Sequence, residues 1–189
     1  RRTWYIPSLP ELYQPFQFGG ARIDPYFNYF KTYRSRKNIH LFTKLSYGLR
    51  NKDINGEIRL NRMYNPFNRG FYSVHIGKDF EEIFSGDAWI NMLKRSNVYL
   101  NQSIGFGHGL ELLNGLFFYT DIDMAFRRSV SGYKTNDWVD SLFGDILSNN
   151  QAIAFSSYNA FYGTLRLEYT PRQRYIREPK EKIILGSAW

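Results

Sequence analysis

Long segments in which apolar and polar residues alternate constrain the fold of this chain more than any other feature. The clearest covers residues 39–50, where one parity is held by Ile39, Leu41, Thr43, Leu45, Tyr47 and Leu49. A period of two puts successive side chains on opposite faces of a β-strand. Strands of soluble proteins average about five or six residues, whereas a tilted strand that crosses a membrane needs about ten. The pattern therefore predicts strands long enough to cross a membrane.

The same alternation recurs along the chain, separated by turn signals. It is present at residues 22–33, 54–64, 71–79, 97–106, 110–127 and 158–170, and a further strand begins at Ile183. Turns are expected at 51–53, at the NPFNRG segment 65–70 and at the Gly-His-Gly segment 107–109. No βαβ rhythm and no fixed-period repeat accompanies them. We predict an all-β fold, an antiparallel up-and-down meander of about seven to eight strands that is part of a larger transmembrane β-barrel.

Three segments depart from this pattern. Residues 1–20 are rich in proline and glycine and predict an irregular lead-in. Residues 80–95 place apolar residues at helical spacing and predict one or two short helical turns. Residues 128–157 are polar and too long for an ordinary hairpin loop. We assign residues 1–189 to one partial barrel domain, with further strands expected beyond its end.

Loop lengths predict an orientation for this barrel. The short connections 34–38, 65–70 and 107–109 fall at one end of the strands, and the long connections 80–95 and 128–157 fall at the other, with 51–53. Barrels of the outer membrane keep short turns in the periplasm and long loops outside. The 65–70 turn is then periplasmic and 128–157 is an extracellular loop.

Composition supports a sheet and leaves the meaning of the charge open. The chain has 16 Phe, 15 Tyr and 4 Trp, no Cys, and a net charge of +8. Lack of cysteine excludes disulfides and cysteine-ligated metals. The chain has no run of eighteen apolar residues, so the sequence predicts no transmembrane helix. A basic chain can bind nucleic acid or an anionic membrane surface. We favour the membrane, because Tyr33, Tyr64, Trp89 and Tyr169 near strand ends fit interfacial girdles.

The candidate reactive residues favour a structural interpretation. The three histidines, His40, His75 and His108, lie in no metal-binding spacing. Asp121 and Asp123 share one strand face and could do acid–base or metal chemistry, but a polar barrel lumen in which Arg127 or a neighbouring arginine neutralises them explains both better. Gly105, Gly107 and Gly109 precede no helix, so they let a strand bend rather than bind phosphate. We therefore predict no enzyme: no catalytic, cofactor-binding or metal-ligating residue and no cofactor.

Several strings together resemble a known family. They are GGARIDPYFNYFK (19–31), NKDINGEIRLNRMYNPFNRG (51–70), GKDFEEIF (77–84), NGLFFYTDIDMAFRR (114–128) and REPKEKIILGS (177–187). They resemble Gram-negative outer-membrane proteins of unknown function whose barrel is similar to that of the surface-antigen and outer-membrane assembly-factor superfamily. The resemblance implies an upstream carboxypeptidase-regulatory-like domain, which carries no peptidase activity, and a location in the bacterial outer membrane.

Four hypotheses follow from the residues and the resemblance. The first is an outer-membrane barrel that transports, assembles or anchors envelope components, in contact with membrane lipid, lipopolysaccharide and other envelope proteins but not with nucleic acid. The second is the barrel of a TonB-dependent receptor. The third is a soluble basic β-sheet module that binds polyanions. The fourth is an outer-membrane hydrolase that uses Asp121, Asp123, or a serine with His75. The number of copies in the assembly is left open.

Overall fold

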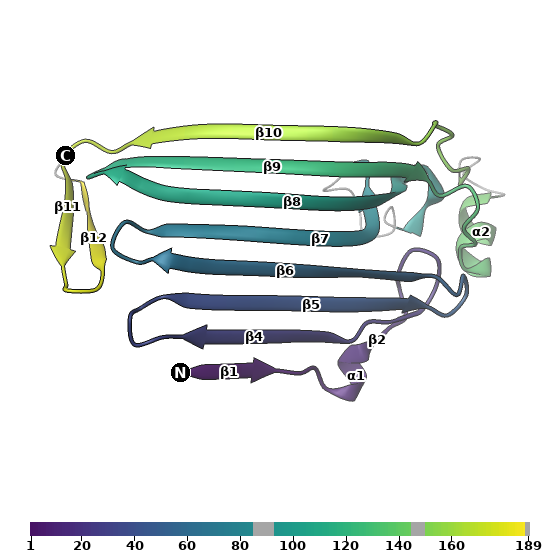
Figure 1. Cartoon of the computed structure of the whole chain (residues 1–189). Helices are drawn as coiled ribbons and strands as arrows, with labels where there is room; N and C mark the ends of the chain where they lie inside the picture. Colours follow the sequence, from purple (N-terminus) through teal and green to yellow (C-terminus); the bar gives the residue numbers. More distant parts are fainter. Residues whose placement is uncertain (85–92, 145–149, 188–189) are drawn as a thin grey trace.

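The computed structural model describes residues 1–84, 93–144 and 150–187. Within them, a 10-stranded sheet contains a meander in which each strand pairs antiparallel with the one before it (Figure 1). Its strands are β4 (Tyr26–Thr32), β5 (Asn38–Gly48), β6 (Ile54–Asn65), β7 (Gly70–Glu82), β8 (Val98–Leu113), β9 (Leu116–Ser129) and β10 (Tyr158–Tyr169). The predicted all-β up-and-down fold is confirmed. The sheet is open, with β1 and β10 at its edges, as a segment of a barrel wall would be.

The first residues are more regular than predicted. The expected irregular lead-in contains β1 (Arg2–Tyr5), α1 (Leu9–Leu12) and β2 (Tyr13–Gln14), and β3 (Arg22–Ile23) follows it. Strand β1 adds to the edge of β4, where Trp4 is opposite Tyr29. Proline at position 7 ends this strand soon after it begins, because proline cannot donate to a strand ladder. A strand of four residues is too short for a period of two to reveal it.

The Gly-His-Gly segment is not a turn, which corrects the sequence prediction. Strand β8 runs for 16 residues through it, and the hairpin turn is Asn114–Gly115. Gly115 has a φ of +79°, and a Cβ there would lie 2.4 Å from the carbonyl oxygen of Thr170. Asn-Gly between two strands is a strong signal for a two-residue hairpin. The long alternating segment 110–127 is therefore the end of β8 followed by most of β9.

The loop-length asymmetry is confirmed, with 114–115 as the third short turn. Residues 33–37, 66–69 and 114–115 connect strands at what we call the turn end of the sheet. The opposite end, which we call the loop end, holds residues 49–53 and the two long connections (Figure 1). One of these includes η2 (Arg95–Asn97), and the other includes α2 (Asp137–Gly144). Residues 80–82 belong to β7, and most of the helical turns predicted after them lie outside the described residues.

The last segment does not continue the meander. Strands β11 (Gln173–Arg177) and β12 (Lys182–Ser187) pair with each other in a separate hairpin at the turn end. Arg36 forms ion pairs there with Glu178 at 3.9 Å and Glu181 at 3.2 Å. The two basic segments, 34–37 and 172–182, therefore lie at the same end of the sheet, as predicted from the connectivity.

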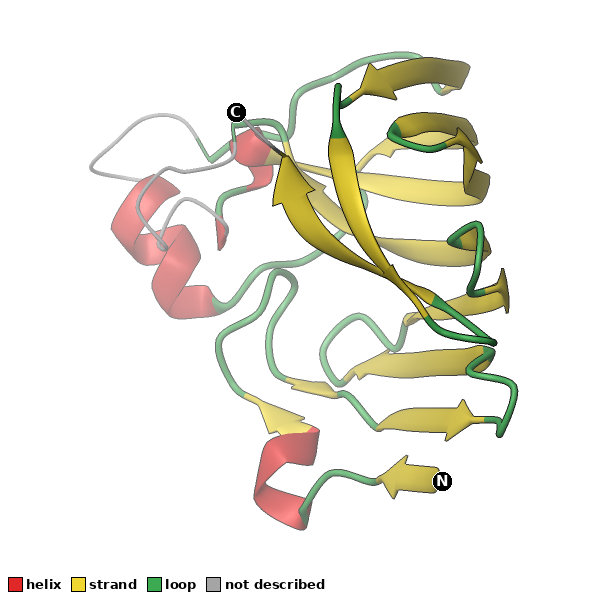
Figure 2. Ribbon diagram, turned by 90° about the vertical axis from the view of Figure 1, so that its left-hand side faces the viewer, coloured by secondary structure: helices red, strands yellow, loops and turns green. Residues whose placement is uncertain are grey.

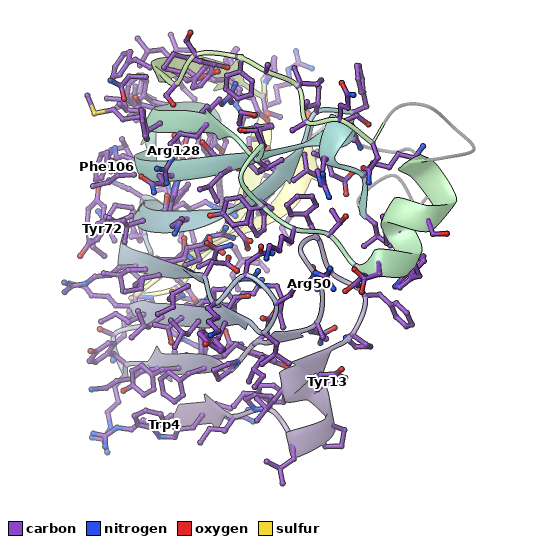
Figure 3. The ribbon with its side chains drawn as sticks, turned by 90° about the vertical axis from the view of Figure 1, so that its right-hand side faces the viewer. Trp4, Tyr13, Arg50, Tyr72, Phe106 and Arg128 are labelled. Carbon is purple, nitrogen blue, oxygen red and sulfur yellow. The ribbon has the colours of Figure 1, made fainter. Side chains whose placement is uncertain are left out.

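One side of the sheet is covered and the other is bare. Figure 2 shows the helices and the long connections on one side, and Figure 3 shows Tyr72 and Phe106 pointing to the other. A small core forms on the covered side at the loop end, where Phe18, Val98, Leu100 and Val130 are buried together. Among residues 1–84, 93–144 and 150–187, no second layer covers the apolar face of the sheet (Figure 2).

Candidate functional site: an apolar face and a polar face

The bare face of the sheet is apolar from β6 to β10. One lateral row, made of residues directly opposite one another on β6 to β10, consists of Ile58, Ile76, Ile104, Met124 and Phe161. Each of these residues is between 50% and 64% exposed. The next row toward the turn end continues with Leu60, Val74, Phe106 and Ile122. We call these two rows the apolar band.

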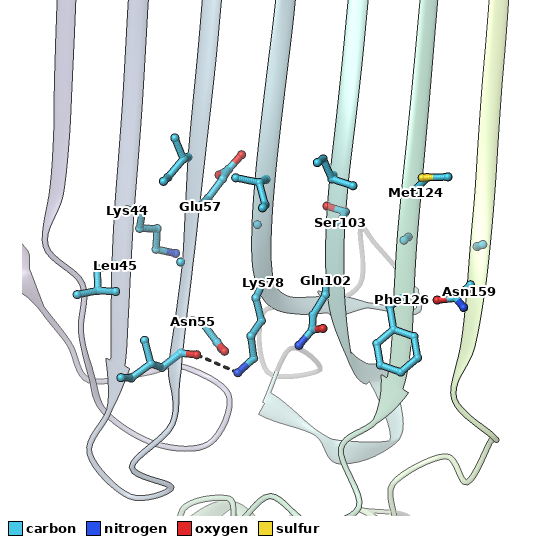
Figure 4. Close-up of a pocket in the computed structure, with 18 of the residues that line it drawn as sticks. Lys44, Leu45, Asn55, Glu57, Lys78, Gln102, Ser103, Met124, Phe126 and Asn159 are labelled. Carbon is cyan, nitrogen blue, oxygen red and sulfur yellow. Dashed lines mark hydrogen bonds between the residues drawn. The ribbon is translucent and has the colours of Figure 1, made fainter.

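Polar and aromatic side chains border the apolar band at both ends. Toward the loop end, Figure 4 shows Lys78, Gln102 and Asn159 in the next row, with Lys78 Nζ donating to the carbonyl oxygen of Ile54 at 2.9 Å. Toward the turn end, the Arg62 Nη1 donates to the Tyr72 hydroxyl at 3.3 Å. Hydrogen-bonding groups therefore border the apolar band toward both the loop end and the turn end.

An aromatic girdle forms at the turn end. The ring of Tyr64 stacks on that of His108, and its hydroxyl lies 2.8 Å from His108 Nε2. Lys31 places its Nζ 4.4 Å from the ring centroid of Tyr33. Tyr33, Tyr64 and Tyr169 lie at or next to strand ends, as the sequence predicted. Trp89, the fourth residue of that prediction, lies outside the described residues.

On the opposite, polar face, glycines of β8 let side chains of β7 and β9 meet. His75 and Asp123 are both directly opposite Gly105, and their Nε2 and Oδ2 atoms are 2.9 Å apart. A Cβ on Gly105 would stand 2.2 Å from His75 Cε1. Glycine inside a strand often marks such a close approach. The sequence predicted that these glycines let a strand bend; Gly105 instead lies within β8, where it lets two side chains meet across the strand.

The candidate aspartates face the same side, as predicted, but their partner differs from the prediction. Asp123 pairs with His75 rather than with Arg127, and both members are about one-third exposed. The other strand-face histidine, His40, lies 3.1 Å from Asn28 Oδ1. No group of three His, Asp or Glu side chains in residues 1–84, 93–144 and 150–187 is placed to hold a metal ion.

A buried charge network fills the polar side at the loop end. Arg22 is 2% exposed and forms an ion pair with Asp53 at 3.0 Å. Its Nε donates to Ser46 Oγ at 2.6 Å, and that hydroxyl donates to Asp24 at 2.5 Å. Asp24 also lies 3.8 Å from Lys44 Nζ, so each carboxylate of this network has a cation beside it and the network anchors the incoming chain to β5. No sequence pattern predicts this network, because Arg22 and its partners Ser46 and Asp53 are far apart in the chain.

A second buried ion pair fixes the β11–β12 hairpin. Lys182 Nζ lies 2.6 Å from Glu111 Oε2, and both side chains are at most 5% exposed. Tyr175 donates its hydroxyl proton to the same carboxylate. Burial of Tyr175 and its hydrogen bond to Glu111 raise the pKa of the phenol to about 12. The hairpin is therefore held against the end of β8 by a charged contact that is shielded from water.

Arg127 presents a different environment on the polar face. Its guanidinium carbon lies 5.2 Å from the ring centroid of Tyr99 and 5.4 Å from that of Tyr162. Its Nη1 donates to the Tyr158 hydroxyl at 3.4 Å. Cavities of about 470 Å³ and 400 Å³ are both lined by this arginine. Sequence reasoning placed Arg127 beside Asp121 and Asp123 and missed the tyrosines, since all three of them come from neighbouring strands.

Comparison with known proteins gives a family and no function. No helix among the described residues is long and apolar enough to cross a membrane. No curated protein and no solved structure matches the chain. The family described as "Family of unknown function (DUF5686) C-terminal domain" matches residues 1–189. With its whole length covered by that match, the chain belongs to the DUF5686 C-terminal-domain family.

Proposed function

We propose that this chain forms part of the wall of a bacterial outer-membrane β-barrel, with its apolar band in contact with lipid. The observation that carries this proposal is the band itself: aliphatic and aromatic side chains, half or more exposed, in a row across β6 to β10. A soluble monomer rarely exposes a contiguous apolar patch of more than a few hundred Å². Lipid is the environment in which such a face is stable.

The dimensions of the strands support the same proposal. Strands β5 to β10 are between 11 and 16 residues long. Along β10, the length from Asn159 to Tyr169 is about 33 Å at a rise of about 3.3 Å per residue. At a tilt of about 45°, this corresponds to about 23 Å along the membrane normal, close to the apolar height of about 25 Å typical of outer-membrane barrels.

The polar face and the loops then have defined places. The polar face, with Arg22, His75, Asp123 and Arg127, lines the lumen. The turn end faces the periplasm, and the loop end, with residues 130–157, faces outward beside lipopolysaccharide. In this arrangement the protein is not an enzyme but serves transport, assembly or anchoring of envelope components.

The polyanion-binding alternative is less well supported. Such a face needs cations and aromatics without competing carboxylates. Here the polar face places Glu57 beside Arg59 and Asp123 beside His75. A polyanion would meet these carboxylates on the same surface as the arginines, so repulsion would offset the attraction.

Site-specific labelling tests the proposal directly, because the chain has no cysteine of its own. Single cysteines at Ile58 and Ile104 probe the apolar band, and a cysteine at Ser103 probes the polar face next to Ile104. Each is labelled with an environment-sensitive fluorophore after the protein is refolded into phosphatidylcholine vesicles. The band labels should be quenched by doxyl lipids and protected from iodide, and the Ser103 label should show the reverse. Equal iodide quenching at all three positions would refute contact with lipid.

A further inference from the structure

We infer that Arg127 is the centre of a binding site for the carboxylate of an acidic sugar on the polar face. The guanidinium is framed by Tyr99 and Tyr162, which hold it by cation–π contacts on both sides. These contacts come from β8 and β10, so three neighbouring strands fix the position of one cation. The inference uses the polar face alone and does not depend on whether the apolar band contacts lipid.

The charge of Arg127 has no carboxylate partner in the described parts of the chain. Three other arginines on this sheet and its turns, Arg22, Arg36 and Arg59, each have a carboxylate within 4 Å. Arg127 contacts the rings of Tyr99 and Tyr162 and the Tyr158 hydroxyl, and its Nε is buried without a hydrogen-bond partner. A desolvated donor without a partner is unfavourable. An anionic ligand in the adjacent cavities would supply the carboxylate that this guanidinium lacks.

Two cavities that Arg127 lines offer space for a ligand. The cavity of about 470 Å³ is also lined by Ser103, Asn101 and Asp123, which bear hydroxyl-binding groups. Asn101 is 8% exposed, and its Oδ1 has no partner although its Nδ2 donates to Glu81 at 2.7 Å. The cavity of about 400 Å³ is lined by Ile83, Ile153 and Phe155, together with Tyr99, Tyr158 and Glu82. The two cavities thus offer hydroxyl partners and ring faces beside one guanidinium.

The surroundings define the chemical class of this ligand. A guanidinium fork binds a carboxylate through two parallel hydrogen bonds. Glu81 and Glu82 line the same cavities, so a ligand with several negative charges would be repelled. The unpartnered Oδ1 of Asn101 accepts a hydrogen bond, which a ligand hydroxyl can donate. One carboxylate on a hydroxylated ring satisfies all three conditions, as in a uronic acid.

Equilibrium dialysis with radiolabelled glucuronate tests the inference on the refolded protein in detergent micelles. The variants are Arg127→Met, which keeps the apolar length of the side chain, and Arg127→Lys, which keeps the charge without the fork. Arg166→Met is the matched control, because Arg166 also lies on the polar face, 4.4 Å from the ring centroid of Tyr119. Glucose and inorganic phosphate serve as competing ligands.

Glucuronate should bind to the parent and to Arg166→Met alike, about tenfold or more weakly to Arg127→Met, and with intermediate affinity to Arg127→Lys. Glucose should compete poorly. Three results would overturn the inference: no glucuronate binding by the parent, equal binding by parent and both Arg127 variants, or displacement by phosphate or glucose as effectively as by unlabelled glucuronate. Circular dichroism of each variant distinguishes lost binding from lost folding, and Arg127→Lys keeps the test valid if Arg127→Met does not fold.

Discussion

Replacing Gly105 by alanine should separate the His75–Asp123 pair. Gly105 lies directly between these residues, and a Cβ at this position would be 2.2 Å from His75 Cε1 and 2.8 Å from Asp123 Oδ2. The optimal separation of non-bonded carbon atoms is about 3.5–4.0 Å. The imidazole must therefore swing away, and its Nε2 loses the contact of 2.9 Å with Asp123 Oδ2.

The size of the effect follows from three contributions. Forcing an extra methyl group into a packed site destabilises by about 1–3 kcal/mol. Loss of one hydrogen bond adds about 0.5–1 kcal/mol, at the low end because the pair is one-third exposed. Alanine is intrinsically more favourable than glycine inside a strand by about 0.5–1 kcal/mol. We expect Gly105→Ala to lower the free energy of unfolding by about 1–3 kcal/mol.

The matched control is Gly163→Ala in β10. In the part of the chain that the structure describes, a Cβ on Gly163 would meet just Phe161 Cε1 at 3.8 Å, an ordinary contact. This variant should be neutral or slightly more stable than the parent. Urea unfolding in lipid vesicles, followed by circular dichroism, measures both variants. The steric reasoning fails if Gly105→Ala and Gly163→Ala unfold at the same urea concentration. Removing the imidazole with His75→Ala should abolish most of the penalty of Gly105→Ala, since the two residues are in contact.

Three further predictions concern the hairpin and the apolar band. Lys182→Met leaves the Glu111 carboxylate buried without its cation and should lower the free energy of unfolding by about 3–5 kcal/mol. The double variant with Glu111→Gln should recover most of this loss in urea unfolding, and no recovery would contradict the pairing. The raised pKa of Tyr175, about 12, means that the folded state favours the neutral phenol, so its stabilisation is complete below the unfolded pKa near 10 and disappears as the pH rises to about 12. The urea midpoint should then fall more steeply over this range in the parent than in Tyr175→Phe, and parallel curves would contradict it. Ile104→Arg should destabilise the vesicle-inserted protein by about 2–4 kcal/mol, whereas Ser103→Arg on the other face should change stability by less than about 1 kcal/mol; equal effects would argue against a lipid-facing band.

The long strands were predictable from the sequence because their two faces have different environments. Residues 39–50 alternate since Leu41 and Leu45 belong to the apolar face and Lys44 and Ser46 to the polar one, and β5 spans Asn38–Gly48. The same physical reason accounts for β6 and β10, whose predicted limits lie within one residue of those observed.

Features that depend on strand register could not be predicted from the sequence. Gly107 and Gly109 carry a turn signature, and only their neighbours Ser73, Asp121, Phe71 and Tyr119 show that they lie within a strand. Likewise, the partner of Asp123 is decided by which residue of β7 lies opposite Gly105. The resemblance drawn from the sequence is confirmed as far as a family of unknown function. An upstream regulatory-like domain and an outer-membrane location stay predictions.

The β11–β12 hairpin does more than occupy the turn end. It contacts the β4–β5 turn through Arg36 and through Lys180, whose Nζ donates to the carbonyl oxygen of Arg34 at 3.3 Å. It contacts the β8–β9 turn region through the pair of Lys182 with Glu111. Strands β6 and β7 lie between these two turns, so the hairpin bridges a section of the sheet. Because the hairpin holds both turns, it sets the distance between them and thereby the curvature of the section that it bridges. A change in the curvature of this sheet would therefore alter the contacts of the hairpin with one of the two turns.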